Sequence, residues 1–279
     1  MKLLRVGDPG QEKVAALDQK NKIRDLSGYI KDLTPQTLIF DTLDKIKNIE
    51  LSNLKEIDPE IRIGSCISKP TDFLAIGLNY KAHAEGTKSK LPDEPIVFNK
   101  SSGCIQGPNE PIIKPKFAHK LDYEVEVAMV IGRKGKYIKE EDSEKYIFGY
   151  CIVNDISERS WQKERGGQWI KGKSIAGPCG PYLVTKDEIK NINNINLSLN
   201  VNGNRRQTGN TERMIFNFNF LISHLSQFMT LYPGTIITTG TPAGTAMEMK
   251  KPKFLKIGDK LHLKVDGLGE QTHEIIDEK

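Results

Sequence analysis

The chain has 279 residues, of which 41 are lysine or arginine and 36 are aspartate or glutamate, so its formal net charge is +5. This small excess is spread along the chain, which argues against a nucleic-acid partner and is compatible with a small anionic ligand. No segment reaches the roughly 18 consecutive apolar residues of a membrane-spanning helix, and the first ten residues lack the apolar core of a signal peptide. We therefore expect a cytoplasmic protein without a membrane partner.

The first quarter of the chain is predicted to form short strands and one helix. The predicted strands cover residues 1–6, 14–17 and 22–25. A stretch with scattered charges predicts a helix around residues 35–48, and Asp58-Pro59 with its polar neighbours is typical of a connector. We expect a small N-terminal α+β domain over residues 1–65 and a main domain over residues 66–279.

Strands dominate the main domain. The predicted strands cover residues 73–76, 96–98, 124–131, 147–153, 182–185, 196–201, 235–239 and 260–265. Helical patterns are confined to residues 155–164 and 217–229. Because strands and helices do not alternate, a doubly wound parallel fold is disfavoured, and the pattern predicts an α+β fold with an extensive antiparallel or mixed sheet.

A histidine follows the first strand of the main domain. Tyr80, His83 and Glu85 lie in a polar segment whose glycines suggest mobility. A histidine there could act as a general base under a mobile lid. An isolated histidine is more often structural, so the local pattern leaves both interpretations open.

The segment 121–131 carries two carboxylates on one strand face. Side chains alternate along a strand, so Glu124 and Glu126 point the same way, about 6.5–7 Å apart. Two carboxylates at a buried strand repel each other and resist ionisation, and a bound cation removes both problems. A half-exposed strand with a polar face explains the local pattern equally well.

A third carboxylate follows another apolar strand. The run Tyr150–Val153 carries no charge and ends in Asn154-Asp155, which places an acid on rigid support. Three oxygen ligands without histidine or cysteine favour Mg²⁺ or Mn²⁺. Asp155 could also simply cap the helix that follows, and the two roles are compatible.

Several polar residues further along are candidates for substrate contacts. Arg159 and Gln162 share a face of the predicted helix, which Gly166-Gly167 would end. Lys173 lies between glycine and serine, where a lysine is usually exposed. Thr241 belongs to a Gly/Thr loop whose N–H groups and hydroxyls could hold a carboxylate, although an ordinary tight turn is as good an explanation.

The cysteines are scattered along the chain. Cys66, Cys104, Cys151 and Cys179 form no CxxC pair and have no histidine pattern nearby. We therefore interpret them as buried free thiols and do not expect structural zinc.

Taken together, the chain resembles the fumarylacetoacetate hydrolase family from about Phe73 to its end. The motifs that carry the resemblance are Gly77-Leu78-Asn79-Tyr80-x-x-His83, Asp122-x-Glu124-x-Glu126, Asn154-Asp155-x-x-x-Arg159-x-x-Gln162, Gly172-Lys173-Ser174 and Thr239-Gly240-Thr241-Pro242. Residues 2–5, 158–169 and 267–270 resemble a bacterial subgroup that includes 2,4-diketo-3-deoxy-L-rhamnonate hydrolases and is often labelled ureidoglycolate lyase.

The resemblance implies a mixed β-roll domain, a homodimer, and Mg²⁺ or Mn²⁺ held by Glu124, Glu126 and Asp155. It also implies a set of substrate-facing residues, Tyr80, Arg159, Gln162, Lys173 and Thr241. The implied substrate is a 2,4-dioxo acid that binds the cation through its carboxylate and 2-oxo oxygen. The cation and Lys173 would stabilise the enolate of pyruvate, and the resemblance implies that His83 is the base for water, which breaks a carbon–carbon bond, or for a proton next to a carbonyl.

Two alternatives use the same groups. A decarboxylase or isomerase of a 2-oxo diacid needs the enolate stabilisation but no positioned water, and a non-catalytic protein would only bind the metal and a 2-oxo acid.

Two departures from the family pattern bear on this choice. Close relatives usually carry a glutamate where this chain has Gly86, so we expect Glu85 to take its place beside His83 in catalysis. The segment 175–178 is about two residues shorter than in the bacterial subgroup. It also lacks the acidic, threonine-containing stretch that the subgroup pattern has there.

Overall fold

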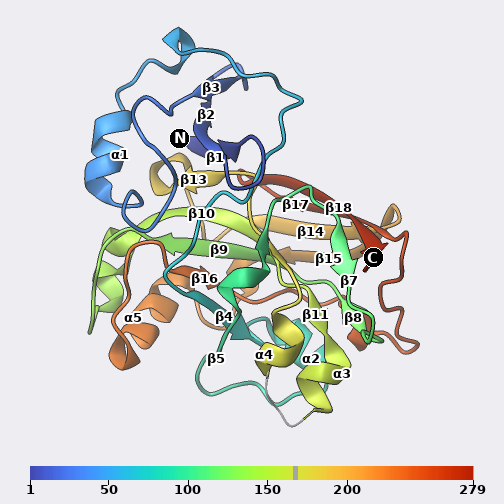
Figure 1. Ribbon diagram of the computed structural model, residues 1–279. Coiled ribbons are helices and arrows are strands. Elements are labelled where there is room, and N and C mark those ends of the chain that lie inside the picture. Colours follow the sequence, from blue (N-terminus) through green and yellow to red (C-terminus); the bar gives the residue numbers. More distant parts are fainter. Residues whose placement is uncertain (166–168, 279) are drawn as a thin grey trace.

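The computed structural model of the chain describes residues 1–165 and 169–278, and these residues form two main sheets (Figure 1). In pairing order, the larger sheet contains β3 (Ile23–Asp25), β2 (Lys13–Leu17), β1 (Lys2–Val6), β13 (Leu183–Thr185), β10 (Ile147–Asn154), β9 (Val125–Ile131), β16 (Ile236–Thr238), β4 (Phe73–Gly77) and β5 (Ile96–Asn99). The second sheet contains β15 (Asn204–Asn210), β14 (Asn196–Val201), β17 (Lys260–Val265), β18 (Gly269–Asp277) and β7 (Ile112–Lys114).

Short elements complete the fold. Two small ladders pair β8 (Leu121–Asp122) with β11 (Ser157–Glu158) and β6 (Ile105–Gln106) with β12 (Gly177–Pro178). The α-helices are α1 (Phe40–Ile46), α2 (Lys81–Gly86), α3 (Arg159–Lys163), α4 (Trp169–Lys173) and α5 (Phe218–Phe228). The 3₁₀ turns are η1 (Leu51–Asn53), η2 (Ser102–Cys104), η3 (Glu140–Tyr146), η4 (Lys186–Glu188), η5 (Thr211–Arg213) and η6 (Ala246–Glu248). Within the described residues, no helix has the length and apolarity that a membrane crossing requires.

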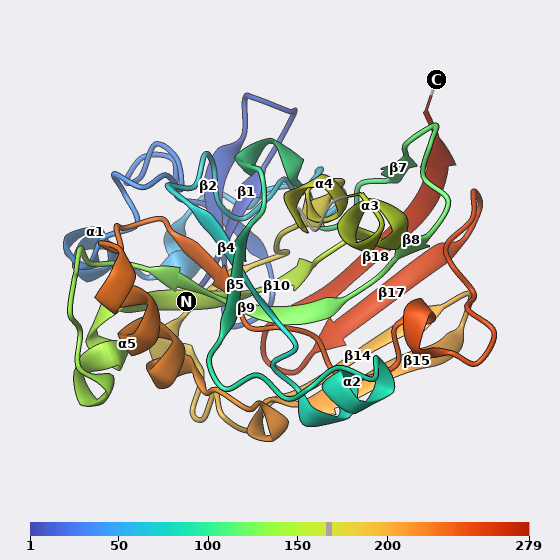
Figure 2. The same ribbon diagram turned by 90° about the horizontal axis from the view of Figure 1, so that it is seen from below.

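The core is built on both faces of β9, every residue of which is buried. Val125, Val127 and Met129 pack toward the second sheet and α5, whereas Ala128 and Val130 pack toward the N-terminal segment that leads into α1. Figure 2 shows the second sheet running alongside β9 and β10. The predicted mixed α+β fold is confirmed, because the larger sheet contains antiparallel pairs such as β9 with β10 and a parallel pair, β16 with β4.

The N-terminal strands extend the larger sheet. Lys2 and Leu3 of β1 pair with Val184 and Leu183 of β13, so the blue segment of Figure 1 lies directly against the main sheet. The boundary at residue 65 stays a prediction.

Some elements differ from the prediction. The polar segment after β4 forms the helix α2 instead of a loop, and β15 and β18 were not predicted as strands. β15 is rich in asparagine and arginine and is held by its ladder with β14, so its conformation comes from a neighbouring strand rather than from its own composition. Gly166-Gly167, expected to end α3, lie outside the described residues.

Candidate metal centre and active site

Three carboxylates meet where β9 begins and β10 ends. The antiparallel register places Val153 opposite Glu126, so Asp155, which follows β10, lies beside Glu124, which precedes β9. The amide of Asp155 donates to the carbonyl of Glu124 at 2.9 Å. One carboxylate oxygen from each of Glu124, Glu126 and Asp155 lies within 4.8 Å of the other two, and all three residues are buried. The structure therefore brings the three predicted ligands together.

Two cationic side chains hold the Glu124 carboxylate. Lys173 Nζ lies 2.5 Å from Glu124 Oε2 and 3.0 Å from Asp155 Oδ2, while Arg159 Nη2 lies 2.6 Å from Glu124 Oε1. Arg159 Nε also donates to Asp122 at 2.9 Å. Burial opposes ionisation of Glu124, but the charges of Arg159 and Lys173 outweigh it and hold the pKa of this carboxyl well below its usual range. Glu124 is therefore ionised at neutral pH.

A second buried lysine contacts Asp155. Lys100, which follows β5, is buried; its Nζ lies 2.5 Å from Asp155 Oδ1 and donates to the carbonyl oxygen of Lys173. No local pattern in the sequence marks this lysine as buried, because a lysine after a strand is usually solvent-exposed.

Glu126 has a different environment from its neighbours. Oε2 accepts a hydrogen bond from the amide of Gly240 at 3.0 Å, and among the described residues no lysine or arginine pairs with this carboxylate. Burial and the negative charges of Asp155 and Glu124 raise its pKa well above the usual range. The ionised cluster thus lacks a positive charge beside Glu126.

A divalent cation fits this donor set. The four buried acids Asp122, Glu124, Glu126 and Asp155 face three buried cations, Lys100, Arg159 and Lys173, which leaves one negative charge uncompensated when all four acids are ionised. A cation between Glu124, Glu126 and Asp155 would supply the missing positive charge, and a donor set made only of carboxylate oxygens suits Mg²⁺ or Mn²⁺.

The cluster opens into a cavity of about 100 Å³. Among its lining residues are the predicted site residues His83, Glu124, Glu126, Arg159, Gln162, Lys173 and Thr241. They come from four places: the start of β9, α2, the α3–α4 pair whose helices lie side by side in Figures 1 and 2, and the loop after β16. One cavity therefore joins the carboxylates with a histidine, a guanidinium and an ammonium group.

Two of the predicted substrate-binding residues, Gln162 and Thr241, are hydrogen-bonded to neighbouring protein groups. Gln162 Oε1 accepts from Arg159 Nη1 at 3.1 Å, which fixes the plane of the guanidinium. The Thr241 hydroxyl donates to the carbonyl of Val125 at 2.9 Å and accepts from Gln207 at 2.8 Å. Thr241 thereby anchors its loop to β9, and its hydroxyl proton is already committed to the protein.

Tyr80 is not brought into this cavity. It is buried and lines a separate cavity together with Glu85 and Pro242. Burial and the charge of Glu126 raise the pKa of its phenol, so the hydroxyl stays protonated. Its expected contact with the substrate stays a prediction.

His83 is paired with Glu248, a residue that no sequence motif connects with it. Its Nδ1 lies 2.7 Å from Glu248 Oε1. The Glu248 carboxylate also accepts from the amide of Gly244 at 3.1 Å and from the hydroxyl of Thr245 at 2.7 Å. Burial opposes ionisation of Glu248, but the hydrogen bond and charge of His83 outweigh it and lower the pKa of the carboxyl. An ionised carboxylate only accepts, so Nδ1–H donates to it and Nε2 is the ring nitrogen left for chemistry in the cavity.

The expected contact between Glu85 and His83 is wrong. The two residues are two positions apart on α2, and each helical position turns by about 100°, so their side chains point to nearly opposite sides. The Glu85 side chain is 62% exposed and lies 3.9 Å from Lys81.

The position of Gly86 explains where the acid comes from. A Cβ at residue 86 would collide with the Glu248 carboxylate, 3.0 Å from its Cδ. Thr245-x-x-Glu248 matches a capping-box pattern, which could have located the turn in the sequence but not its histidine partner.

Comparison with known proteins gives consistent matches over the whole chain. The family described as fumarylacetoacetate (FAA) hydrolase C-terminal matches residues 72–276. A curated protein of Burkholderia cenocepacia named "Putative hydrolase" is 48% identical over 274 residues, covering 97% of each chain. A solved structure of fumarylacetoacetate hydrolase from Exiguobacterium antarcticum is 28% identical, with a TM-score of 0.89 and full coverage of both chains. The maleylpyruvate hydrolase of Sphingobium sp. SYK-6, solved with manganese(II) and pyruvate, is 23% identical with a TM-score of 0.83 and full coverage of both chains, and this likeness concerns the fold alone.

Proposed function

The chain belongs to the fumarylacetoacetate hydrolase family, and we propose that it is a Mg²⁺- or Mn²⁺-dependent hydrolase acting on a carbon–carbon bond. The proposed substrate is a 2,4-dioxo acid of the acylpyruvate type, and the products are pyruvate and a second acid. One observation carries the proposal: Glu124 and Glu126 of the three-carboxylate cluster line the same cavity as His83, whose imidazole is held from behind by Glu248.

Glu124, Glu126 and Asp155 would hold the cation. When bound, it would polarise the 2-oxo group of the substrate and stabilise the negative charge that develops when the carbon–carbon bond breaks. The fold relative from Sphingobium sp. SYK-6 is described with manganese(II) and pyruvate. For this chain, the cation is inferred from the charge and donor atoms of its own carboxylates.

Lys173 and Arg159 supply fixed positive charge to an anionic substrate. Burial lowers the pKa of Lys173, but the charges of Asp155 and Glu124 outweigh it and raise the pKa overall, so the ammonium stays protonated. It has three N–H donors, and Glu124 and Asp155 accept two of them. The third is available for a substrate oxygen, so Lys173 stabilises charge rather than acting as a base.

His83 is the base for water. With Nδ1–H donating to Glu248, Nε2 takes a proton from a water molecule as its oxygen adds to the carbonyl at C4 of the substrate. The bond between C3 and C4 then breaks, its electron pair passes to the pyruvate enolate, and the second acid leaves. The proton held by His83 returns to C3 of the enolate, which completes pyruvate.

The alternative is a decarboxylase or isomerase of a 2-oxo diacid, which would need no activated water. The His83–Glu248 pair provides an oriented imidazole with a free Nε2, which is the arrangement that water activation requires; an isomerase would use the same nitrogen on a proton next to a carbonyl, whereas decarboxylation needs no such base. A protein that only binds the metal and a 2-oxo acid would have no use for this pair.

One assay separates these functions. The purified protein is incubated with Mg²⁺ or Mn²⁺ and a panel of acylpyruvates and oxaloacetate, and pyruvate and CO₂ are followed. Pyruvate without CO₂, abolished by EDTA and restored by either cation, supports the proposal. CO₂ release identifies a decarboxylase, and binding without turnover rules out both enzymes.

We further propose, from the family resemblance, a cytoplasmic homodimer. Exposed aromatic side chains such as Phe117 and Phe228 are compatible with a covered surface. Light scattering should give twice the monomer mass at micromolar concentration, and fractionated cells should hold the protein in the cytoplasm. A monomer at that concentration would contradict the oligomeric part.

A further inference from the structure

Three of the four cysteines, distant in sequence, meet in the core. Cys66 precedes β4, Cys151 lies in the middle of β10, and Cys179 lies between β12 and β13. The Sγ atoms of Cys66 and Cys179 are 3.7 Å apart, those of Cys151 and Cys179 are 3.5 Å apart, and all three lie within 4.8 Å of one another. All four cysteines are buried free thiols, as the sequence predicts, but three of them are not isolated.

The spacing of the sulfur atoms matches a metal-thiolate centre. With metal–sulfur bonds of about 2.3 Å, tetrahedral or trigonal coordination places sulfur atoms roughly 3.8–4.0 Å apart. The Cys66–Cys179 and Cys151–Cys179 separations are within a few tenths of an ångström of that value. Small changes of side-chain torsion would therefore seat a cation between the three sulfurs without moving the strands.

The surroundings also bring positive charge close to the three sulfurs. The guanidinium of Arg5 donates to the carbonyl of Ser65 at 3.2 Å, one residue before Cys66, and brings positive charge near the cluster. Neutral thiols packed as small apolar groups are the competing interpretation.

We propose that Cys66, Cys151 and Cys179 form a binding site for one thiophilic d¹⁰ cation, of the Zn²⁺ or Cu⁺ type, separate from the three-carboxylate cluster. Soft thiolate ligands select these cations over Mg²⁺ and Mn²⁺. Binding releases the thiol protons to solvent and requires no oxidant, because the sulfurs and the cation keep their oxidation states.

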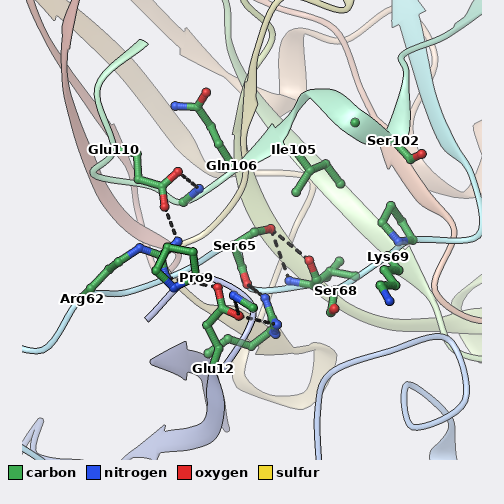
Figure 3. A pocket seen from close by; sticks show the side chains of 16 residues that line it. Pro9, Glu12, Arg62, Ser65, Ser68, Lys69, Ser102, Ile105, Gln106 and Glu110 are labelled. Carbon is green, nitrogen blue, oxygen red and sulfur yellow. Dashed lines mark hydrogen bonds and ion pairs between the residues drawn. The ribbon is translucent and has the colours of Figure 1, made fainter. Parts of the chain in front are cut away.

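A route to the site starts at a neighbouring cavity. Figure 3 shows Ser65 on the wall of a cavity of about 650 Å³, close to the carboxylates of Glu12 and Glu110. Both carboxylates are paired with arginines, Glu12 with Arg5 and Arg62 and Glu110 with Arg62, so a cation would reach Cys66 through a local displacement of the backbone at Ser65. A bound cation would join the segment before β4 to β10, whose next residues lead to Asp155.

Cadmium is a suitable probe because cadmium–thiolate bonds absorb in the near ultraviolet and carboxylate ligands do not. Reduced, metal-free protein is titrated with Cd²⁺ and, in a second arm, with Cu⁺, after expression with and without added Zn²⁺. The variants Cys66→Ala and Cys179→Ala are compared with Cys104→Ala. Cys104 belongs to the same apolar cluster and is also buried, but it is not among the three grouped thiols, so it is the matched control.

We expect one equivalent of thiolate-bound cation in the wild type and in Cys104→Ala. In Cys66→Ala and Cys179→Ala the affinity should fall by on the order of 100-fold or more, because a ligand is lost. Competition between Zn²⁺ and Cu⁺ in the wild type identifies which cation the site prefers. Cleavage of the proposed substrate serves as a check that each variant is folded.

X-ray absorption on the cadmium-loaded wild type does not depend on the variants. Three sulfur neighbours support the site, and a shell of oxygen atoms alone overturns it. A thiolate absorbance of equal size in Cys66→Ala, or none in the wild type at saturating Cd²⁺ and Cu⁺, also overturns it.

Discussion

Nδ1 of His83 lies 2.7 Å from Oε1 of Glu248, although the two residues are 165 positions apart in the chain. The carboxylate fixes the tautomer of the imidazole and would stabilise the imidazolium that forms when Nε2 takes a proton. This one contact gives the histidine the orientation that a general base needs. The carboxylate belongs to the turn η6, which carries no sequence pattern that connects it with catalysis.

Glu248→Gln should lower kcat by about 100- to 1000-fold, because the amide no longer stabilises the imidazolium and general-base catalysis contributes this much. KM should change little, since Glu248 does not line the cavity. Steady-state kinetics with an acylpyruvate measures both parameters. Glu85→Gln is the matched control on the neighbouring exposed carboxylate and should behave as wild type; a large loss in Glu85→Gln would mean that the pairing in solution differs.

Gly86→Ala should lower kcat by roughly tenfold or more, because the new methyl group displaces the carboxylate that orients the base. Alanine has the higher helix propensity, so the loss of stability should be small compared with the loss of activity. The double variant Gly86→Glu with Glu248→Ala should recover part of the activity lost in Glu248→Ala, since it supplies an acid from residue 86, three positions after His83 on the same helix. Steady-state kinetics of each variant, measured at the same interval below its own Tm, checks this prediction. A fully active Gly86→Ala would disprove the proposed need for space at residue 86.

Glu126→Gln should stabilise the metal-free protein at alkaline pH. The pKa of Glu126 is raised above its ordinary value of 4.5 in the folded protein, so as pH rises the unfolded chain loses this proton first. Each pH unit between the two pKa values therefore costs about 1.4 kcal/mol of stability, a cost that is absent at pH 4 and that glutamine removes.

Thermal unfolding in EDTA checks the sign. The variant should have a Tm a few degrees above wild type at pH 8 and about the same Tm at pH 4. Mg²⁺ should reverse the order at pH 8, since only the wild type gains stability by binding it. Equal Tm values at pH 8 in EDTA, or an Mg²⁺ response that survives in Glu126→Gln, would refute the assignment of Glu126 as a ligand.

Lys100→Met should lower the free energy of unfolding by about 3–5 kcal/mol, because it leaves the buried Asp155 carboxylate and the Lys173 carbonyl without this partner. Lys163→Met is the control: Lys163 lines the cavity beside the carboxylate cluster, and within the described residues the ion pairs of that cluster are made by Lys100, Arg159 and Lys173 instead. Urea denaturation of both variants without metal gives the comparison. Similar losses in the two variants would show that the Lys100 contacts are not specific.

The central strands were predictable because their signal is local. The apolar runs of β9 and β10, and the alternation that puts Glu124 and Glu126 on one face, depend only on neighbours in the chain. The antiparallel register then makes Asp155 meet them. The polar strands β15 and β18 lack such a signal, since they are held by their partner strands.

The amino-acid sequence by itself thus determined the strand pattern, the carboxylates and, through its motifs, the family. Only the tertiary structure decided that Glu248 rather than Glu85 contacts His83, that Lys100 is buried against Asp155, and that three of the cysteines meet. The physical reason is the same in each case. These contacts join side chains from different elements, so they depend on how helices, turns and sheets pack, and no local periodicity in the chain encodes that packing.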